Sequence, residues 1–273
     1  MAPSRVIRGL STAATVLALV GGALAAGPSA GATADPITHP DQDHMGSGLA
    51  ARTSSNVAAP AVSGLKGLDV ASYQGNVNWS TVKSNGATFA YVKATEGTSY
   101  TNAYFSQQYD GSYDAGMIRG AYHFAHPDSS SGTAQADYFV AHGGGWSGDG
   151  KTLPPALDIE YNPSGATCYG LSAASMVGWI ADFSNEVHAR TSKYPMIYTT
   201  YDWWSTCTGD SSAFAATNPF WIAKYSSTAP TSLPAGTGYW TIWQNADSGT
   251  FPGDQDVFNG SYAQPQTLAT NAD

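Results

Sequence analysis

Two carboxylates stand two residues apart where an apolar run ends, in Leu157-Asp158-Ile159-Glu160. Residues i and i+2 of a strand point to the same face, so a strand ending here places the two α-carbons about 6.5–7 Å apart on one side. Crowded carboxylates repel, and one of them then keeps its proton to a higher pH. A neutral acid beside an ionised carboxylate is the pair that glycoside hydrolysis uses, although a solvated strand end or a helix N-cap explains this spacing equally well.

Two further aspartates occupy apolar runs near the start and the end of the chain's main part. Asp69 lies in Gly67-Leu68-Asp69-Val70, and Asp256 lies in the run that closes with Phe258. An aspartate in such a run is costly unless it is paired or used. If the first and last strands are neighbours in a closed barrel, Asp69 and Asp256 face each other at the end that also carries Asp158 and Glu160; Asp254 is the alternative for this position. Each aspartate alone also suits an Asx-turn, but four acids at strand ends favour a shared site.

Alternating strands and helices are expected to position these residues. Eight apolar or β-branched runs predict strands: Gly67–Ser72, Phe89–Ala94, Ile118–Phe124, Ala156–Glu160, Met196–Thr200, Phe220–Tyr225, Tyr239–Gln244 and Gln255–Phe258. Four segments predict helices: Asn78–Asn85, Ala103–Ala115, Thr133–Gly143 and Ser172–Arg190, the last with Ser172 as its N-cap. After Thr200 the connections read as loops rich in Gly, Ser, Thr and Pro.

This alternation is typical of parallel βα units, and eight strands in about 200 residues favour an irregular, TIM-like (β/α) barrel of the α/β class. An open doubly wound sheet is the alternative. Such a sheet usually carries a glycine-rich phosphate turn after its first strand, whereas here the first strand continues into Asp69-Val70-Ala71-Ser72-Tyr73.

Composition narrows the function classes. The chain has 273 residues, of which 42% are hydrophobic, 12% aromatic and 11% charged, and this mixture excludes a disordered chain, a coiled coil and a collagen-like repeat. The formal net charge is −9, and no run of Lys and Arg occurs, so nucleic acid is not an expected partner.

The N-terminus predicts export. Arg5 and Arg8 precede an apolar stretch that ends in the small-residue site Ala32-Thr33-Ala34, so residues 1–34 are interpreted as a signal peptide. The stretch is too short for a membrane anchor of about 20 residues, and no integral membrane segment is expected in the mature chain. Residues 35–64 have little periodicity and are interpreted as a propeptide or flexible linker. Residues 65–273 form the predicted catalytic barrel domain of a secreted, extracellular monomer.

Cysteine and histidine usage predicts a disulfide and no metal or other cofactor. In an oxidising compartment Cys168 and Cys207 are expected to form one disulfide, with two free buried thiols as the alternative. The two cysteines lack a nearby CxxC or HxxxH partner, and His123 and His126 lack an evident third ligand.

Several motifs together resemble one enzyme family. They are Gly67-Leu68-Asp69-Val70-Ala71-Ser72-Tyr73-Gln74-Gly75, Lys93-Ala94-Thr95-Glu96-Gly97, Arg119-Gly120-Ala121-Tyr122-His123-Phe124, Leu157-Asp158-Ile159-Glu160, Ile197-Tyr198-Thr199-Thr200, Phe220-Trp221 and Trp243-Gln244. In this order, over roughly residues 65–270, they resemble glycoside hydrolase family 25, the Chalaropsis-type lysozymes, and especially its secreted actinomycete muramidases. The resemblance implies a modified barrel of eight strands and about five helices. It also implies hydrolysis of the β-1,4 bond between N-acetylmuramic acid and N-acetylglucosamine in bacterial peptidoglycan.

The resemblance also implies residue roles. Glu160 would be the general acid, and Asp158 would steady the substrate's 2-acetamido group or the positive charge itself. Asp69 and Asp256 would tune the acid and orient the sugar. Flat sugar faces stack on aromatic rings, and the rings expected to contact substrate are Tyr122, Tyr161, Trp243, Tyr73 and Phe124.

Two other function classes remain as alternatives. A chitinase-like hydrolase would carry a longer acidic run before Glu160, but Pro154 and Pro155 stand where its earlier acids belong. A non-catalytic protein that binds cell-wall carbohydrate would typically lack one of the acids, whereas all four are present here.

Overall fold

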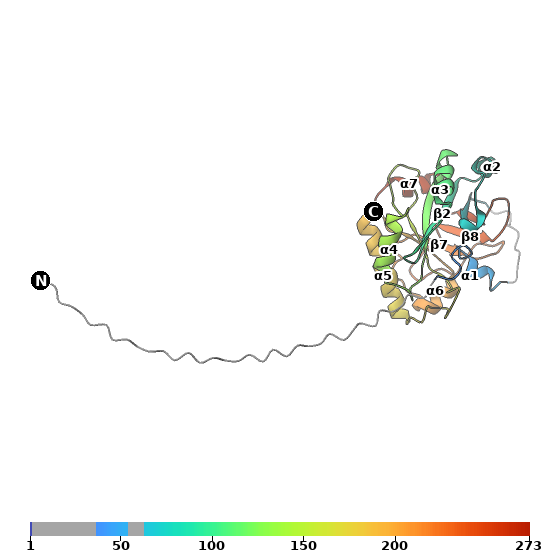
Figure 1. The fold of residues 1–273 in the computed structure, drawn as a ribbon. Helices are drawn as coiled ribbons and strands as arrows, with labels where there is room; N and C mark the ends of the chain where they lie inside the picture. The colour runs from blue at the N-terminus through green and yellow to red at the C-terminus, as the bar shows by residue number, and fades with distance from the viewer. Residues whose placement is uncertain (2–36, 54–62) are drawn as a thin grey trace. The chain divides into compact units, whose positions relative to one another are not determined.

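A closed barrel of eight strands forms the body of the protein (Figure 1). The computed structural model describes Met1, residues 37–53 and residues 63–273. The barrel closes because β1 (Leu65–Val70) pairs with β2 (Phe89–Glu96) on one side and with β9 (Asp254–Phe258) on the other. The remaining barrel strands are β4 (Ile118–Phe124), β5 (Ala156–Asp158), β6 (Met196–Thr199), β7 (Phe220–Ala223) and β8 (Ile242–Ala246), and the two-residue β3 (Tyr100–Thr101) adds to the edge of β2. The predicted eight-stranded α/β barrel is therefore confirmed.

The direction of β9 departs from the expected parallel pattern. The barrel strands from β1 to β8 run parallel to their neighbours, but β9 is antiparallel to both β1 and β8. The start of β9 therefore lies at the barrel end where the other strands finish. In this register Asp69 pairs with Asp254, and Gly67 pairs with Asp256.

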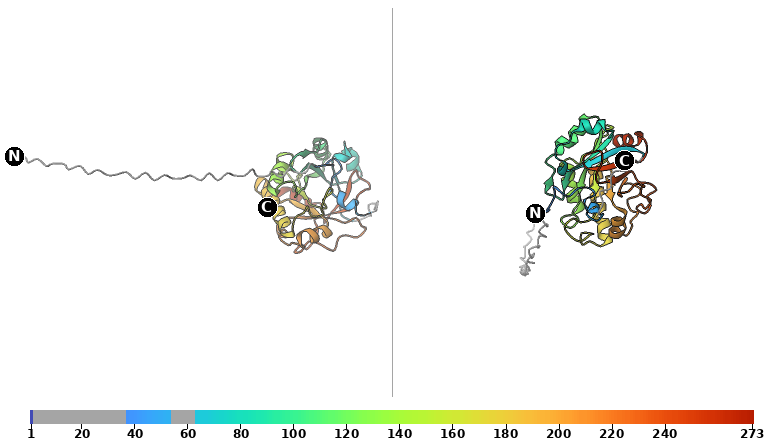
Figure 2. Two further views of the ribbon diagram at one scale, coloured as in Figure 1. Left: turned by 60° about the horizontal axis from the view of Figure 1, so that its bottom comes forward. Right: turned by 90° about the vertical axis from the view of Figure 1, so that its right-hand side faces the viewer.

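Helices surround the strands, as the two views in Figure 2 show. The described residues contain seven α-helices: α1 (Ser47–Ala50), α2 (Trp79–Ser84), α3 (Phe105–Asp114), α4 (Gly132–Ala141), α5 (Ala173–Thr191), α6 (Tyr201–Thr208) and α7 (Ala263–Thr270), besides one 3-10 turn at Ser72–Gln74. The four predicted helices are α2 to α5, and Ser172 caps α5 by accepting a hydrogen bond from the Ser175 amide. The expectation of loops directly after Thr200 is wrong, because the Thr200 hydroxyl accepts from the Trp203 amide and so begins α6.

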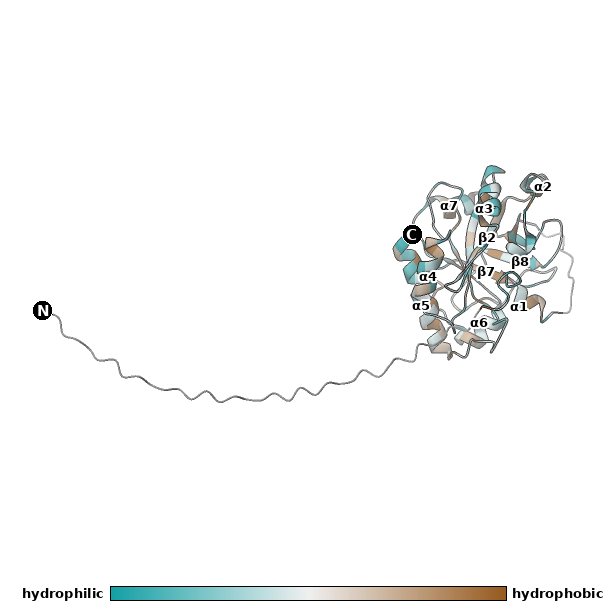
Figure 3. Cartoon of the chain, viewed as in Figure 1, coloured by the Kyte–Doolittle hydropathy of each residue, from teal (hydrophilic) through white to brown (hydrophobic). Residues whose placement is uncertain are grey.

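The alternating strand pattern divides the buried side chains between two regions. One set packs inside the barrel, including Tyr91, Met196 and Trp221. The other set packs between the strands and the outer helices, including Leu157 on β5 and Phe183 on α5. Figure 3 accordingly shows hydrophobic colour on the strands and hydrophilic colour over α2 and parts of α4 and α5. Towards the end where β1 to β8 finish, the interior becomes polar: Asp69, Asp158 and Gln244 are all buried there.

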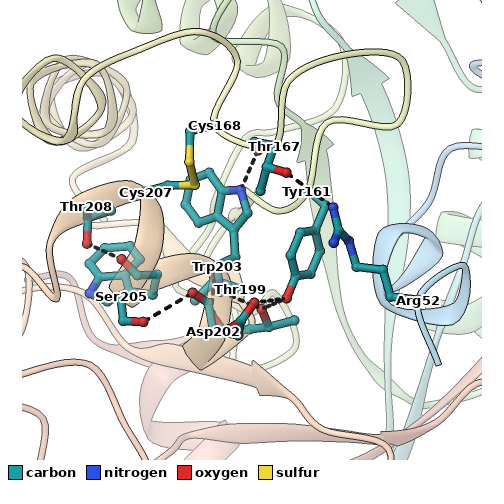
Figure 4. Close-up of a disulfide and its surroundings, with 12 residues drawn as sticks. Arg52, Tyr161, Thr167, Cys168, Thr199, Asp202, Trp203, Ser205, Cys207 and Thr208 are labelled. Carbon is teal, nitrogen blue, oxygen red and sulfur yellow. Dashed lines mark hydrogen bonds between the residues drawn. A yellow bond between two sulfur atoms is a disulfide. The ribbon is translucent and has the colours of Figure 1, made fainter.

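The predicted disulfide is present between Cys168, in the loop after β5, and Cys207 in α6 (Figure 4). The two α-carbons lie 5.3 Å apart and the cysteines are separated by 39 residues. Beside the bond, the Trp203 indole donates a hydrogen bond of 3.0 Å to the Thr167 carbonyl oxygen. The disulfide thus ties the loop that follows the acidic strand to the helix that follows β6.

Removing this bond is expected to destabilise the barrel without unfolding it. Closing a loop of about 40 residues stabilises a native state by about 4 kcal/mol in the chain-entropy model. The double variant Cys168→Ser/Cys207→Ser should therefore melt about 10 °C below the wild type. Differential scanning calorimetry checks this expectation, with the variant also run in reductant as a control that should not shift. A wild-type melting temperature that reductant leaves unchanged would contradict it.

None of the helices in the described residues combines the length and the apolar character that a bilayer crossing needs.

Part of the predicted propeptide or linker is ordered against the barrel. Residues 37–53 include the short helix α1 and belong to the same compact unit as the barrel. Met45 is completely buried and packs with the interior set that includes Tyr122 and Tyr198. The predicted signal peptide, residues 1–34, lies outside the described residues except for Met1 and stays a prediction.

Candidate active site

The predicted acids converge at one end of the barrel. Asp69 is the last residue but one of β1, Asp158 closes β5 and Glu160 follows it, and all three are at most 2% exposed. The Gln244 side-chain amide links two of the aspartates: its Nε2 donates to Asp69 Oδ2 at 2.9 Å and to Asp254 Oδ2 at 2.8 Å. Parallel strands place their carboxyl ends at one edge, which is why residues far apart in sequence meet here.

Asp254, rather than Asp256, occupies the position opposite Asp69. Because β9 is antiparallel, its first residue lies at the acidic end and its third lies deeper in the barrel. Asp256 receives a hydrogen bond of 3.1 Å from the Trp221 indole, and its Oδ2 has no hydrogen-bond partner among the described residues. The preference for Asp256 at the seam is thus corrected: Asp254 pairs with Asp69 at the mouth, and Asp256 lies two residues deeper in the barrel.

Burial makes these carboxyls hard to ionise. Desolvation raises the pKa of Glu160 to about 8, although hydrogen bonds from the Gly46 and Gly48 amides act against the rise. It raises the pKa of Asp69 to about 7, against hydrogen bonds with Gln244 and Asp256. The pKa of Asp158 is raised well above its usual range by burial and by the neighbouring Glu160. The crowding expected from the sequence therefore adds to the larger effect of desolvation.

Asp158 and Glu160 differ in their hydrogen bonds. Neither carboxylate oxygen of Asp158 has a partner among the described residues. Both oxygens of Glu160 accept backbone hydrogen bonds from the segment ahead of the barrel: Oε1 from Gly46 N at 2.8 Å and Oε2 from Gly48 N at 3.1 Å. Asp158 thus has unused acceptor capacity, while Glu160 is fully engaged.

Four of the five predicted aromatic contacts lie near the acids. Tyr122 is buried at the base of the site, and its hydroxyl accepts a hydrogen bond from Met45 N at 3.4 Å. Tyr161 follows Glu160 and donates its hydroxyl to Asp202 at 2.8 Å (Figure 4). Tyr73 is 70% exposed just beyond β1. Phe124 ends β4 and is paired in register with Asp158.

Trp243 does not join them. Successive residues of a strand point to opposite faces, and Gln244 on β8 faces the acids. Trp243 therefore points away from the site, where its indole donates to the Lys224 carbonyl oxygen at 2.7 Å and its ring packs against Trp240. This position does not fit the predicted substrate contact.

The polar residues that complete the site were not predicted from the sequence. Gln244 bridges two aspartates and accepts a hydrogen bond of 2.7 Å from the Tyr198 hydroxyl. The Tyr225 hydroxyl lies 3.4 Å from Asp254 Oδ2. The sequence did hold a signal for Gln244. Successive side chains of a strand point to opposite faces, so with Trp243 facing outward its neighbour Gln244 faces the interior.

A second polar cluster borders the acids at the end of β2. Lys93 Nζ lies 2.5 Å from Glu96 Oε2, and His126 Nε2 lies 2.7 Å from Glu96 Oε1. Burial alone would raise the pKa of Glu96, but the His126 hydrogen bond and the Lys93 charge outweigh it and lower that pKa. Together with Asp43, Glu96 and His126 form a group whose possible ligand atoms all lie within 4.8 Å of one another, close enough to hold a metal ion. The Lys93 ammonium already supplies a positive charge there.

Raised carboxyl pKa values predict that the folded protein loses stability as pH rises. Asp69 and Glu160 have folded pKa values of about 7 and about 8, whereas unfolded carboxyls titrate near 4. Between these limits the folded state holds protons that the unfolded state has lost, so the free energy of unfolding falls with rising pH. The melting temperature should be higher at pH 5 than at pH 8.

The variant Asp69→Asn tests this expectation because it removes one of the titrating groups. Its melting temperature should depend less on pH than that of the wild type, while Asp110→Asn, on an exposed position of α3, should leave the dependence unchanged. A wild-type melting temperature that rises from pH 5 to pH 8 would contradict the expectation.

Comparison with known proteins gives a consistent result. The sequence profile described as Glycosyl hydrolases family 25 matches residues 68–254. Lysozyme M1 of Streptomyces globisporus is 53% identical over 230 residues, covering 82% of this chain and 78% of the relative. The N,O-diacetylmuramidase of Chalaropsis sp is 54% identical over 209 residues, covering 76% of this chain and 99% of the relative.

The solved structures agree. The bacterial lysozyme of Streptomyces coelicolor has a TM-score of 0.75 and 53% identity, over 78% of this chain and all of that chain. The family 25 lysozyme of Aspergillus fumigatus has a TM-score of 0.75 and 50% identity, over 77% of this chain and all of that chain. Barrel, acidic strand ends and family profile coincide in one stretch of sequence, and on these grounds the chain belongs to glycosyl hydrolase family 25.

Proposed function

We propose that this protein is a secreted lysozyme, a 1,4-β-N-acetylmuramidase that hydrolyses the β-1,4 bond between N-acetylmuramic acid and N-acetylglucosamine in bacterial peptidoglycan. The observation that carries the proposal is the meeting of Asp69, Asp158, Glu160 and Asp254 at one end of a family 25 barrel. The names of the Streptomyces globisporus and Chalaropsis relatives, a lysozyme and an N,O-diacetylmuramidase, support the choice of substrate.

Glu160 is the general acid in this proposal. Burial keeps its carboxyl protonated near neutral pH, and a protonated carboxyl is what the departing sugar requires. The glycosidic bond breaks between the anomeric carbon and the bridging oxygen, which takes the Glu160 proton. Water then supplies hydroxide to the anomeric carbon and its remaining proton to Glu160, so the acid is regenerated.

Asp158 handles the positive charge that develops in this step. Its unpartnered oxygens suit either of two roles. They can accept the N–H of the sugar's 2-acetamido group and so orient the acetamido oxygen toward the anomeric carbon, or they can stabilise that carbon's charge directly. In both roles Asp158 acts in its ionised form, and the positive charge of the transition state stabilises that form.

The aspartates across the barrel act as positioning residues. Asp69 and Asp254 are tied together through the Gln244 amide, and Asp256 lies deeper in the barrel, held by the Trp221 indole. When ionised, the carboxyls of Asp43 and Asp69 raise the pKa of Glu160 further and thus help the acid to keep its proton.

Analysis of the products tests the proposed bond. Purified peptidoglycan is digested, the new reducing ends are reduced with borohydride, and the fragments are identified by mass spectrometry. We expect muramitol at the reduced ends. Glucosaminitol would indicate cleavage of the other glycosidic bond, and peptide release without new reducing ends would indicate an amidase; either result would overturn the proposal.

Export is tested on the same protein. N-terminal sequencing of protein from the culture medium should show a chain that begins after residue 34, and retention inside the cell would contradict secretion. Light scattering of this preparation tests the predicted monomer.

A further inference from the structure

The segment ahead of the barrel lies directly across the proposed catalytic groove. Residues 37–53 are held by contacts with the ends of several strands, not by one local patch. At one end of the segment, Lys93 Nζ donates to the carbonyl oxygens of Pro40 at 2.9 Å and Asp43 at 2.5 Å. At the other end, the Arg52 guanidinium lies 4.1 Å from the centre of the Tyr161 ring (Figure 4).

The centre of the segment fills the space beside the acids. Met45 is completely buried among the interior residues, and its carbonyl oxygen accepts a hydrogen bond of 3.3 Å from Gln244 Nε2. The Gly46 carbonyl oxygen accepts from the Tyr225 hydroxyl at 3.3 Å. These contacts use groups that line the site and would otherwise be open to a sugar.

The segment also contacts Glu160, the proposed general acid. The Gly46 and Gly48 amides occupy both oxygens of Glu160. An N–H donor requires an acceptor oxygen, so two such donors favour the ionised carboxylate. A general acid must instead carry a proton and approach the glycosidic oxygen within hydrogen-bond distance. With the segment in place, the Gly46 and Gly48 amides occupy the positions from which a glycosidic oxygen would have to approach Glu160, so the second condition cannot be met.

Glycine is required at the point of closest approach. Gly46 has a φ of +84°, and a Cβ built there would lie 2.1 Å from the Tyr225 hydroxyl oxygen and 2.9 Å from Asp254 Oδ2. A Cβ on Gly48 would lie 2.8 Å from Glu160 Oε2. The segment is therefore fitted to this groove at the level of single atoms.

Open pockets flank the segment on both sides. One, of about 440 Å³, is lined by Ile37 and Thr38 from the segment together with His126 and Asn162 from the barrel. The other, of about 280 Å³, has Leu49 and Thr53 from the segment and Tyr161 and Tyr225 from the barrel among its lining residues. A groove that extends beyond its occupant at both ends suits a ligand longer than the segment, as a glycan strand would be.

We propose that residues 37–53 are an internal inhibitor that occupies the glycan groove, so that the chain becomes an active hydrolase only after this segment leaves. The inference rests on the proposed function for the identity of the excluded substrate. Departure of the segment removes the Gly46 and Gly48 amides from Glu160, opens the space of Met45 to a sugar, and joins the two flanking pockets into one groove.

Cleavage in place is the first test. A recognition sequence for a site-specific protease is inserted into the full chain between Ala59 and Pro60. Release of soluble fragments from peptidoglycan is then measured before and after cleavage and gel filtration. A segment that holds nine-tenths of the molecules closed lowers the rate about tenfold. We therefore expect cleavage to raise the rate at least about tenfold. Equal rates before and after removal of the segment would overturn the proposal.

A variant of the uncleaved chain is the second test. Gly46→Asp adds a Cβ where no space exists and a negative charge beside Asp254, so it should expel the segment and raise the rate of the intact chain towards that of the cleaved form. Ala51→Asp is the matched control, because it adds the same charge at an exposed position of the same segment. Activation by both variants, or by neither, would contradict the fitted contact.

A binding measurement separates this proposal from the proposed function. A fluorescent peptide of residues 37–53 is titrated into the cleaved, filtered protein up to about 1 mM, the order of the effective concentration that a short tether provides. Fluorescence anisotropy should show binding that the Gly46→Asp peptide lacks. Absence of binding would overturn the internal inhibitor. If the peptide binds but neither the uncleaved nor the cleaved protein hydrolyses peptidoglycan, the segment remains a ligand of the groove and the muramidase assignment is contradicted instead.

Discussion

The Glu160→Gln variant should lose hydrolysis of peptidoglycan almost completely and still fold as the wild type does. Glutamine keeps the size of the side chain and can accept hydrogen bonds, but it has no acidic proton for the departing sugar oxygen. Loss of a general acid costs about 10²–10⁴-fold in rate. The measurement is kcat for soluble fragment release by cleaved chains, with thermal unfolding recorded in parallel. The melting temperature should stay level or rise, because the substitution removes a buried ionisable group.

The chain provides a close control for this variant. It contains only three glutamates, Glu96, Glu160 and Glu186, and Glu186 lies on α5, outside the acid cluster. Glu186→Gln makes the same chemical change away from the acids and should leave kcat unaltered. Full turnover by Glu160→Gln would remove this residue from the mechanism, whereas a comparable loss in the control would point to a general effect on folding.

Asp158→Asn is the second substitution with a large expected effect. Asparagine preserves shape but cannot carry the negative charge that steadies the developing positive centre or orients the acetamido N–H. Removing one preorganised electrostatic contact of this kind costs about 10²–10³-fold in kcat. We expect a fall of this size with folding intact, since Asp158 makes no side-chain hydrogen bond in the described structure that the substitution would break.

Two measurements separate this role from a merely structural one. Substrate binding, measured as KM, should change far less than kcat, because the charge matters most in the transition state. Asp182→Asn, at an exposed position of α5, is the matched control and should behave as the wild type. A variant at position 158 with normal kcat would exclude Asp158 from the chemistry.

The two substitutions differ in what they leave behind. Glu160→Gln removes a proton donor and Asp158→Asn removes a negative charge, so a double variant should be only slightly worse than the poorer single variant. Groups that act in one chemical step are strongly non-additive. Simple multiplication of the two losses would indicate separate steps.

Local patterns in the chain accounted for a large part of the site. Alternation of apolar and acidic residues placed Asp69 and Asp158 on strands, with Glu160 at the end of the same run, because side chains of a strand alternate between its two faces. The structure ends β5 at Asp158, so Glu160 lies just beyond the strand. The same rule, applied to Trp243 and Gln244, would have chosen Gln244 for the interior. Ser172 predicted the start of α5, because a serine at the N-cap can accept a hydrogen bond from a free amide in the first turn of the helix.

Other features depend on contacts between distant segments. The choice between Asp254 and Asp256 follows from the direction of β9, and that direction is set by pairing with β1, almost 190 residues earlier in the chain. The pKa of Glu160 depends on burial and on the Gly46 and Gly48 amides. The Met45 contacts join a segment of little periodicity to the ends of several strands.

By itself, then, the chain's sequence determined which residue types stand at which strand ends, since burial alternation and capping act between near neighbours along the chain. Only the tertiary structure decided which way the last strand runs, which aspartate borders the mouth, and what lies over Glu160. The physical reason is that strand pairing and docking are selected by the combined burial and hydrogen bonding of surfaces that form only when the whole barrel closes.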